Sequence, residues 1–333
     1  MANSTLDAIR TKIRRLTRAP SEAQLTTTQL DEYVNTFVLY DFPEHLRLFA
    51  LHTDASFYTT PNVDEYSSDG VGSPHPLANI ENTYITFNPP VYIAGIPGTW
   101  TQSRDQFYGW YPKVASIRSI GVTGNGATTA YAGTIASAPF LRGEVLIEAE
   151  DANGNGMPLI DEPVIGSSTG NMIYANNGVN VGTINYVTGA FSVTFPSAPA
   201  SGVAINSQVV PFQAAKPRVV LYYDNKFFVR PVPDQVYKIQ MEAYIRPTEL
   251  LASNQSPDLE QWWQYIAYGA AKKIFEDRMD LESVALILPE FMKQERLVLR
   301  RTIVQQTNVR TPTIYTEQAG LGTSWGWGSN FNN

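Results

Sequence analysis

The chain of 333 residues contains no cysteine and only three histidines. The absence of cysteine excludes disulfide frameworks, thiolate zinc sites, iron–sulfur clusters and cysteine nucleophiles. Three histidines, His45, His52 and His75, are too few for a histidine-rich metal centre. No nucleophile motif accompanies them, so we interpret them as capped or surface residues.

Charged residues are also scarce. They make up 17% of the chain, against a typical share of about 25%, whereas aromatic residues make up 12%. Low charge with many aromatic residues indicates surface that other subunits cover. The net charge of −7 argues against a nucleic-acid-binding surface spread over the whole protein. A local basic stripe at Arg14, Arg15 and Arg18 could contact nucleic acid or an acidic partner, or be a solvated helix face.

Long apolar runs are missing as well. No stretch approaches the roughly 18 consecutive apolar residues that a membrane-spanning helix needs, and the N-terminus carries polar and charged residues where a secretory signal has an apolar run. We therefore expect no membrane contact and a protein made and kept in a soluble compartment.

Lysine and arginine nearly disappear from the middle of the chain. Residues 118–210 hold 2 basic and 6 acidic residues, whereas residues 211–333 hold 14 and 13. This middle segment is rich in Gly, Ser, Thr and Asn and contains short alternating apolar runs at 144–150 and 184–195. Several short strands separated by turns are typical of a β-sandwich. We predict that residues 118–210 form an inserted all-β domain.

The flanking segments contain helical patterns. Apolar residues recur at spacings of three and four, which predicts helices at 4–18, 28–41, 257–279 and 290–306. Ser4 or Thr5 is the expected cap of the first helix and Ser256 that of the third. Pro289 is expected to separate a short helical turn at 281–288 from the last helix.

Strand patterns lie between these helices. Strands are expected within 57–66 and 83–87, in a hairpin at 218–231 that turns at Asp224-Asn225, and at 236–247, where alternate residues are apolar. The chain is therefore predicted to have an α+β fold, a helical bundle with a β-rich part, plus an inserted β-sandwich. We expect a core at 1–117 and 211–310, the insert at 118–210 and an extended, flexible C-terminal arm at 311–333.

One motif could bind a metal ion. The spacing of an EF-hand calcium loop, with oxygen ligands at alternate positions, is matched by Asp151, Asn153, Asn155, Gly156 and Glu162. The flanks have strand patterns, however, whereas the EF-hand needs flanking helices. The alternative interpretation is an Asn/Gly-rich turn between two strands.

No other pattern indicates catalysis or a cofactor. Gly124-Asn125-Gly126 lacks the third glycine and the helix of a dinucleotide-binding motif, and there is neither a Walker motif nor a G-x-S-x-G elbow. The adjacent acids Asp64-Glu65 and Asp161-Glu162 are more typical of solvated turns than of a glycosidase pair. We predict a protein that is not an enzyme and holds no cofactor.

The order of elements resembles a known family. FFVRPVPDQVYKIQMEAYIRPTELL precedes the acid-capped segment DLEQWWQYIAYGAAKKIFED, a second helix and a tail, and the N-terminal helices contain LTTTQLDEYVNTFVLYDFPEHL. In these features the chain resembles the head-to-tail adaptor (connector) proteins of tailed bacteriophages. The insert at 118–210 departs from compact adaptors, and it could hold tail fibres or decorate the neck.

The resemblance implies a virion structural protein that assembles in the host cytoplasm. Such proteins form a ring, commonly of twelve copies, beneath the portal protein, and the ring receives the tail tube or nozzle protein below. Genome DNA would pass through the ring without specific binding. The arm would bind the portal through Thr311, Ile314, Tyr315, Trp325, Trp327 and Phe331.

Two alternatives remain at this point. Within structural proteins, the chain could be a tail-tube or fibre-attachment component of the neck. From another class, it could be a carbohydrate-binding receptor protein that uses the β domain and the aromatic cluster of Phe107, Tyr108, Trp110 and Tyr111. A core or interface role for this cluster is favoured, because large aromatic residues dominate both.

Overall fold

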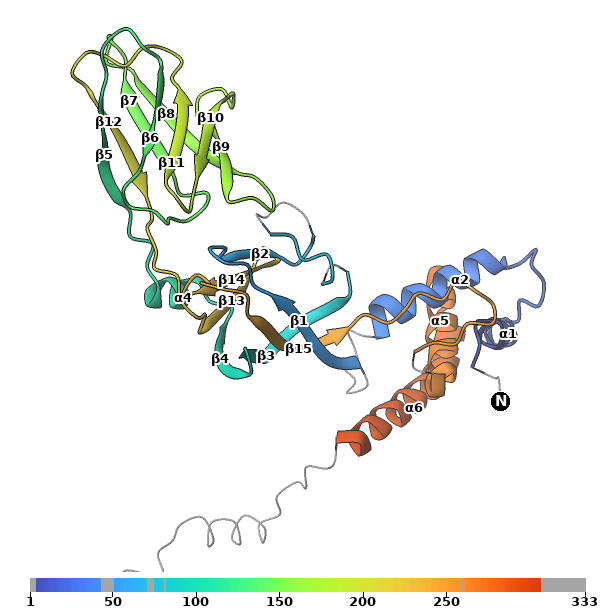
Figure 1. Ribbon diagram of the computed structural model, residues 1–333. Helices are drawn as coiled ribbons and strands as arrows, with labels where there is room; N and C mark the ends of the chain where they lie inside the picture. Colours follow the sequence, from blue (N-terminus) through green and yellow to red (C-terminus); the bar gives the residue numbers. More distant parts are fainter. Residues whose placement is uncertain (1–3, 43–50, 71–74, 81, 259, 307–333) are drawn as a thin grey trace, which may run out of the picture. The chain divides into compact units, whose positions relative to one another are not determined.

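The computed structural model describes residues 4–42, 51–70, 75–80, 82–258 and 260–306. The chain divides into two compact units, a helical unit at 1–52 and 245–333 and a β unit at 53–244 (Figure 1). Helices and sheets are thus both major components, which confirms the α+β class. The predicted core contributes to both units, and the predicted insert belongs to the β unit.

The helical unit contains α1 (Leu6–Leu16), α2 (Thr27–Thr36), a π-helical turn (Phe37–Asp41), a 3₁₀ turn (Glu260–Trp262), α5 (Trp263–Asp277) and α6 (Leu281–Gln306). The Thr5 side chain caps α1 by accepting a hydrogen bond from the Ala8 amide, so Thr5 is the cap of the two residues that the sequence offered. Thr26 caps α2 in a reciprocal capping box with Gln29. Polar side chains therefore define where both N-terminal helices begin.

Two predictions about the C-terminal helices are wrong. Pro289 lies inside α6 and does not break it. Pro289 is exposed, and Ile287 and Phe291 on either side of it are held in packing contacts, so tertiary contacts outweigh the lost backbone hydrogen bond. Ser256 caps no helix, because its hydroxyl lies 3.5 Å from that of Ser4 and α5 begins seven residues later.

An aromatic cluster holds the helical unit together. The Phe37 ring lies 5.3 Å from the ring of Tyr265, and Tyr265 stacks on Phe291 at 5.1 Å. Phe42 packs on Tyr265 at 5.4 Å. Gly269 of α5 provides the space for Phe37, since a Cβ there would lie 2.2 Å from the Phe37 ring carbons. The cluster joins α5, α6 and the turn after α2.

The first sheet of the β unit is a seven-stranded half-barrel with the order β1-β15-β3-β4-β13-β14-β2. Its strands are β1 (His52–Tyr58), β2 (Glu65–Ser67), β3 (Tyr84–Ile93), β4 (Ile96–Thr101), β13 (Val219–Tyr223), β14 (Lys226–Arg230) and β15 (Lys238–Ile245). The hairpin of β13 and β14 turns at Asp224 and Asn225, both with positive φ, as the sequence predicted. A short helix, α4 (Arg104–Trp110), follows β4.

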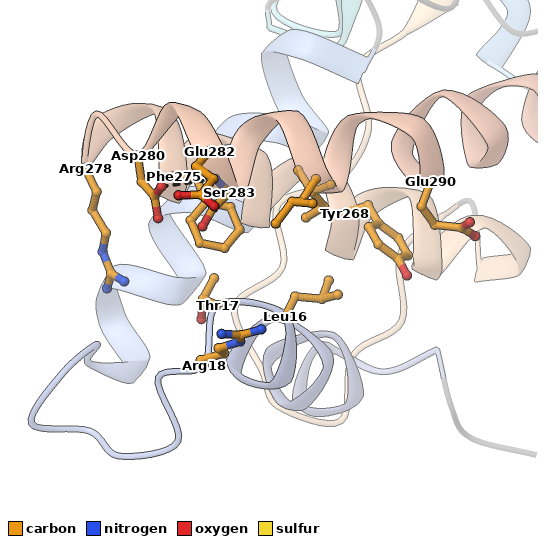
Figure 2. A pocket seen from close by; sticks show the side chains of 12 residues that line it. Leu16, Thr17, Arg18, Tyr268, Phe275, Arg278, Asp280, Glu282, Ser283 and Glu290 are labelled. Atoms are coloured by element: carbon orange, nitrogen blue, oxygen red, sulfur yellow. Dashed lines mark hydrogen bonds between the residues drawn. The ribbon is translucent and has the colours of Figure 1, made fainter.

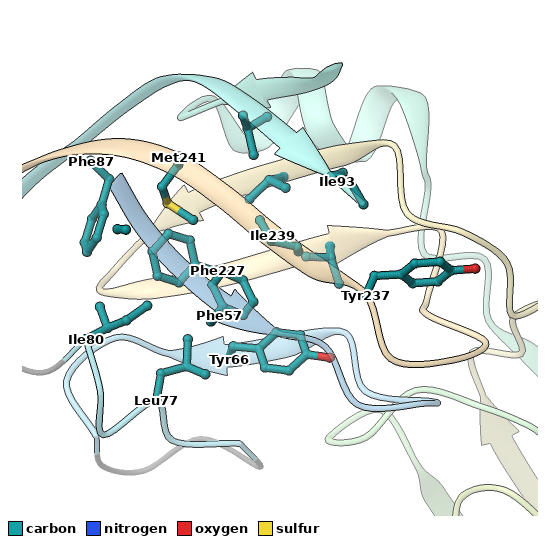
Figure 3. Packing of buried hydrophobic residues seen from close by; sticks show 14 of the residues in the cluster. Phe57, Tyr66, Leu77, Ile80, Phe87, Ile93, Phe227, Tyr237, Ile239 and Met241 are labelled. Carbon is teal, nitrogen blue, oxygen red and sulfur yellow. The ribbon is translucent and has the colours of Figure 1, made fainter. Parts of the chain in front are cut away.

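The half-barrel encloses an aromatic and aliphatic core (Figure 3). Phe227 lies 5.1 Å from both Phe57 and Phe87, measured between ring centres. On β15 the alternate residues Ile239, Met241 and Ala243 are buried, which confirms the predicted alternation.

The second sheet of the β unit contains eight strands in the order β5-β12-β7-β8-β9-β10-β11-β6. They are β5 (Ser116–Thr123), β6 (Ala130–Thr134), β7 (Leu146–Glu150), β8 (Gly156–Pro163), β9 (Thr169–Tyr174), β10 (Asn180–Asn185), β11 (Ala190–Thr194) and β12 (Ala204–Val209). The predicted two-sheet sandwich is wrong. Strands β7 to β11 each pair with the next, so one continuous sheet curls around a single core into a nearly closed barrel.

The close approach at Gly269 gives a stability prediction. We expect Gly269→Ala to lower the free energy of unfolding of the helical unit by about 1–3 kcal/mol, because the added methyl group collides with a ring fixed on both sides. Denaturant unfolding followed by circular dichroism measures it. Gly109→Ala is the matched control, because that helical glycine has no atom within 4 Å of its Cβ position. Equal stability of the two variants would contradict the packing assigned to Phe37.

Candidate functional site

A groove runs along the helical unit between the end of α1, the end of α5 and the first turns of α6 (Figure 2). Its volume is ≈ 600 Å³. Leu16, Phe275 and Ile287 supply apolar lining, and Leu286 lies at its edge with 74% of its surface exposed. This helical groove has an apolar base large enough for side chains of a protein partner.

Charged groups of both signs surround the helical groove. Asp280 accepts a hydrogen bond from the Ser283 amide, and its bonds with Ser283 lower the pKa of the Asp280 carboxyl. Hydrogen bonds from Gln294 and Lys293 likewise lower the pKa of Glu290. These carboxylates therefore stay ionised and serve as helix-stabilising groups.

A second apolar surface lies along α6. Leu281, Ala285, Leu288, Met292 and Leu299 follow one another at spacings of 4, 3, 4 and 7 residues, and Glu295 occupies the intervening position. These spacings place them on one side of the helix. Leu281 is 78% exposed, Met292 44% and Leu299 39%. We call these five residues the α6 stripe. Among the described residues, neighbouring side chains leave the stripe largely uncovered, which is typical of a surface that contacts another protein.

The predicted basic stripe on the first helix is only partly free. Arg10 forms a bidentate pair with Asp31 at 2.6 Å. Arg14 donates to the backbone carbonyls of Ser21 and Leu25, so it fixes the loop between α1 and α2. Arg15 and Arg18 are exposed. Arg10 and Arg14 therefore stabilise the helical unit.

The β unit contains a buried ion pair. Arg230 of β14 lies 2.7 Å from Asp64, and the two side chains are 7% and 13% exposed. Removing one partner of such a pair leaves an uncompensated buried charge.

A second polar cluster links the loop before β7, strand β8 and Tyr186, which follows β10. The amides of Gly143 and Val145 and the hydroxyl of Tyr186 donate to the Asp161 carboxylate. Burial raises the pKa of Asp161, and burial also raises the pKa of Tyr186. Arg142 covers the Tyr186 ring. Asp161 thus holds the loop before β7 in place. The sequence pattern had indicated a solvated turn residue at this position, and that interpretation is wrong for Asp161.

The structure brings only part of the predicted calcium loop together. The amides of Asn153 and Asn155 donate to Asp151 Oδ1, and the Asn155 side chain donates to Oδ2. The Asn155 hydrogen bonds lower the pKa of Asp151. Glu162, however, lies six residues further along β8, about 20 Å from the start of that strand. The turn between β7 and β8 therefore satisfies the carboxylate of Asp151 with its own amides, as the alternative interpretation proposed.

The other predicted residues have varied positions. Phe107 is fully buried, Tyr108 is half-buried, and Trp110 is 45% exposed. The aromatic cluster is thus divided between a core contact and the surface. His45 and the arm residues Thr311, Ile314, Tyr315, Trp325, Trp327 and Phe331 lie outside the described residues. The α6 stripe and the helical groove were missed in the sequence, because helical periodicity does not distinguish a buried side from an exposed one.

No family model and no curated protein matches the chain. Within the described residues, no three His, Asp or Glu side chains gather in a way that could hold a metal ion. In the same part of the chain, no helix has both the length and the apolar character to cross a membrane.

The turn geometry predicts how the protein responds to calcium. We expect calcium to leave the melting temperature unchanged, because Asp151 is engaged by backbone amides and Glu162 is remote from it. Differential scanning calorimetry with and without calcium measures this. A calcium-dependent rise in melting temperature that Asp151→Ala abolishes would show that the loop closes around the ion.

The buried ion pair gives a second prediction. Asp64→Ala should destabilise the β unit by about 3 kcal/mol, because Arg230 is left buried and unpaired. The neighbouring Glu65→Ala is the matched control, since its pair with Lys226 is more exposed and should contribute about 1 kcal/mol or less. Urea unfolding measures both. Equal losses of unfolding free energy in Asp64→Ala and Glu65→Ala would contradict the role given to the buried ion pair.

Proposed function

We propose that this protein is a non-enzymatic structural component of a virion, a head-to-tail adaptor that assembles as a ring between the portal and the tail. The observation that carries the proposal is the α6 stripe. Leu281, Met292 and Leu299 remain exposed on a helix whose other side is already packed against α5. Apolar surface of this kind favours association with other proteins.

The stripe supports contacts between copies of the chain. A repeated apolar spacing along 19 residues of helix, from Leu281 to Leu299, offers an elongated seam suited to side-by-side helix packing. In the ring, each copy would cover the stripe of its neighbour. The helical groove lies along another part of α6 and would take no part in this contact between copies.

The charge distribution fits the proposed position in the virion. Residues 1–117 hold 8 basic and 12 acidic residues, and the insert holds 2 and 6. An acidic channel wall repels the phosphate backbone and lets the genome pass without being held. Residues 311–333 would extend to the portal through their aromatic side chains, and the eight-stranded sheet would contact the tail tube or fibres.

Matched substitutions on α6 test this proposal. We expect Leu281→Lys combined with Leu299→Lys to prevent ring formation with the portal protein of the same virion, because charges would enter the seam. The control combines Leu286→Lys with Leu297→Lys. Leu286 and Leu297 are 74% and 42% exposed, close to the 78% and 39% of Leu281 and Leu299. They lie on another side of the helix, about 140–160° around its axis from Leu281.

Size-exclusion chromatography with light scattering measures the assembled mass. The control pair should assemble as the unaltered chain does. Assembly that survives the stripe substitutions, or that is lost only in the control pair, would place the contact between copies elsewhere and overturn the proposal.

A further inference from the structure

A cleft of ≈ 370 Å³ lies within the β unit, where the chain passes between its two sheets. It is formed by three stretches that are remote in sequence, residues 110–113, 210–215 and 230–232, together with Leu141. Trp110, Tyr111 and Phe212 provide aromatic surface, and three prolines, Pro112, Pro211 and Pro231, stiffen the lining. We call it the aromatic cleft.

The charges that reach the aromatic cleft are already neutralised. Only 6% of the surface of Arg230 is exposed, and its side chain is paired with Asp64. Lys113 is paired with Glu144. An occupant therefore needs no net charge.

Three polar side chains of the lining remain available to an occupant. The Trp110 indole N–H, the Tyr111 hydroxyl and the Gln213 amide form no hydrogen bond with any described residue. Two donors and one amide are few for a sugar, which presents hydroxyl groups around its whole ring. They suit the widely spaced carbonyl and amide groups of an extended polypeptide that inserts an apolar side chain.

We propose that the aromatic cleft binds the C-terminal segment, residues 307–333, of another copy of this chain. The segment has 27 residues, and fully extended it would span about 90 Å, enough to reach a second copy. Its only charged side chains are Arg310 and Glu317, so it matches the neutral cleft. Trp325 and Trp327 are side chains of the type that fills aromatic pockets at interfaces.

This inference is independent of the adaptor proposal, because the cleft and the segment both belong to this chain. Docking would cover the tryptophans of the segment in the free protein. A segment that engages a portal would have to leave the cleft first, so the portal and the cleft would compete for the same residues.

The test is the binding of a fluorescein-labelled synthetic peptide of residues 307–333 to the full chain. The acceptor chain carries Trp325→Ala, Trp327→Ala and Phe331→Ala, so that its own segment does not compete. We expect saturable binding by fluorescence anisotropy. Trp110→Ala in the acceptor should weaken the affinity at least about tenfold. Ala215→Phe, which fills the cleft, should weaken it similarly.

Two controls distinguish binding in the aromatic cleft from nonspecific binding of the peptide. Tyr92→Ala in the acceptor removes an aromatic residue that is 40% exposed outside the cleft, and it should leave the affinity unchanged. A peptide with the same three alanine substitutions should not bind. Circular dichroism verifies that each acceptor variant is folded.

The proposal is overturned if the peptide does not bind, or if Trp110→Ala and Ala215→Phe acceptors bind it as tightly as their parent. It is also overturned if a labelled oligosaccharide, and not the peptide, shows binding that these two variants abolish.

Discussion

The helical unit depends on one packing constraint, which is that α6 carries more apolar surface than α5 can cover. Phe291 stacks on Tyr265, and Ile287 and Val298 are buried with it. Leucines on two other sides of the helix stay exposed. Burying a leucine stabilises by about 2 kcal/mol, so a partner that covers several of them gains substantial free energy. One side of the helix therefore serves the fold, and the α6 stripe is the side that we propose for association.

In the β unit the main constraint is that buried charged side chains need partners. Arg230 and Asp64 compensate each other, and Asp161 is held by backbone amides and Tyr186. With these charges satisfied, the surface between the sheets is aromatic and nearly neutral. The low charge content of the chain thus corresponds to identifiable surfaces, the α6 stripe in one unit and the aromatic cleft in the other.

Local signals predicted local structure well. The Thr5 cap, the turn at Asp224 and Asn225 and the alternation on β15 are all decided by residues close in sequence, and all three are found. Predictions failed where distant contacts decide. Packing on both sides of Pro289 keeps α6 continuous. Whether the strands form a two-sheet sandwich or one curled sheet depends on which strands pair with each other. Short runs of alternating apolar residues predict strands but do not specify their partners.

The candidate sites show the same limit. The calcium spacing is present in the sequence, but the hairpin of β7 and β8 carries Glu162 away from Asp151. The aromatic cleft gathers residues from 110 to 232, and only the folded chain brings them together.

Association through surfaces on the folded chain is the central claim, and the mass of the unaltered protein tests it most directly. Native mass spectrometry of the full chain, alone and mixed with the portal protein of the same virion, should give a closed oligomer of many copies, near twelve, in complex with the portal. A strict monomer that does not interact with the portal at any concentration would contradict the claim.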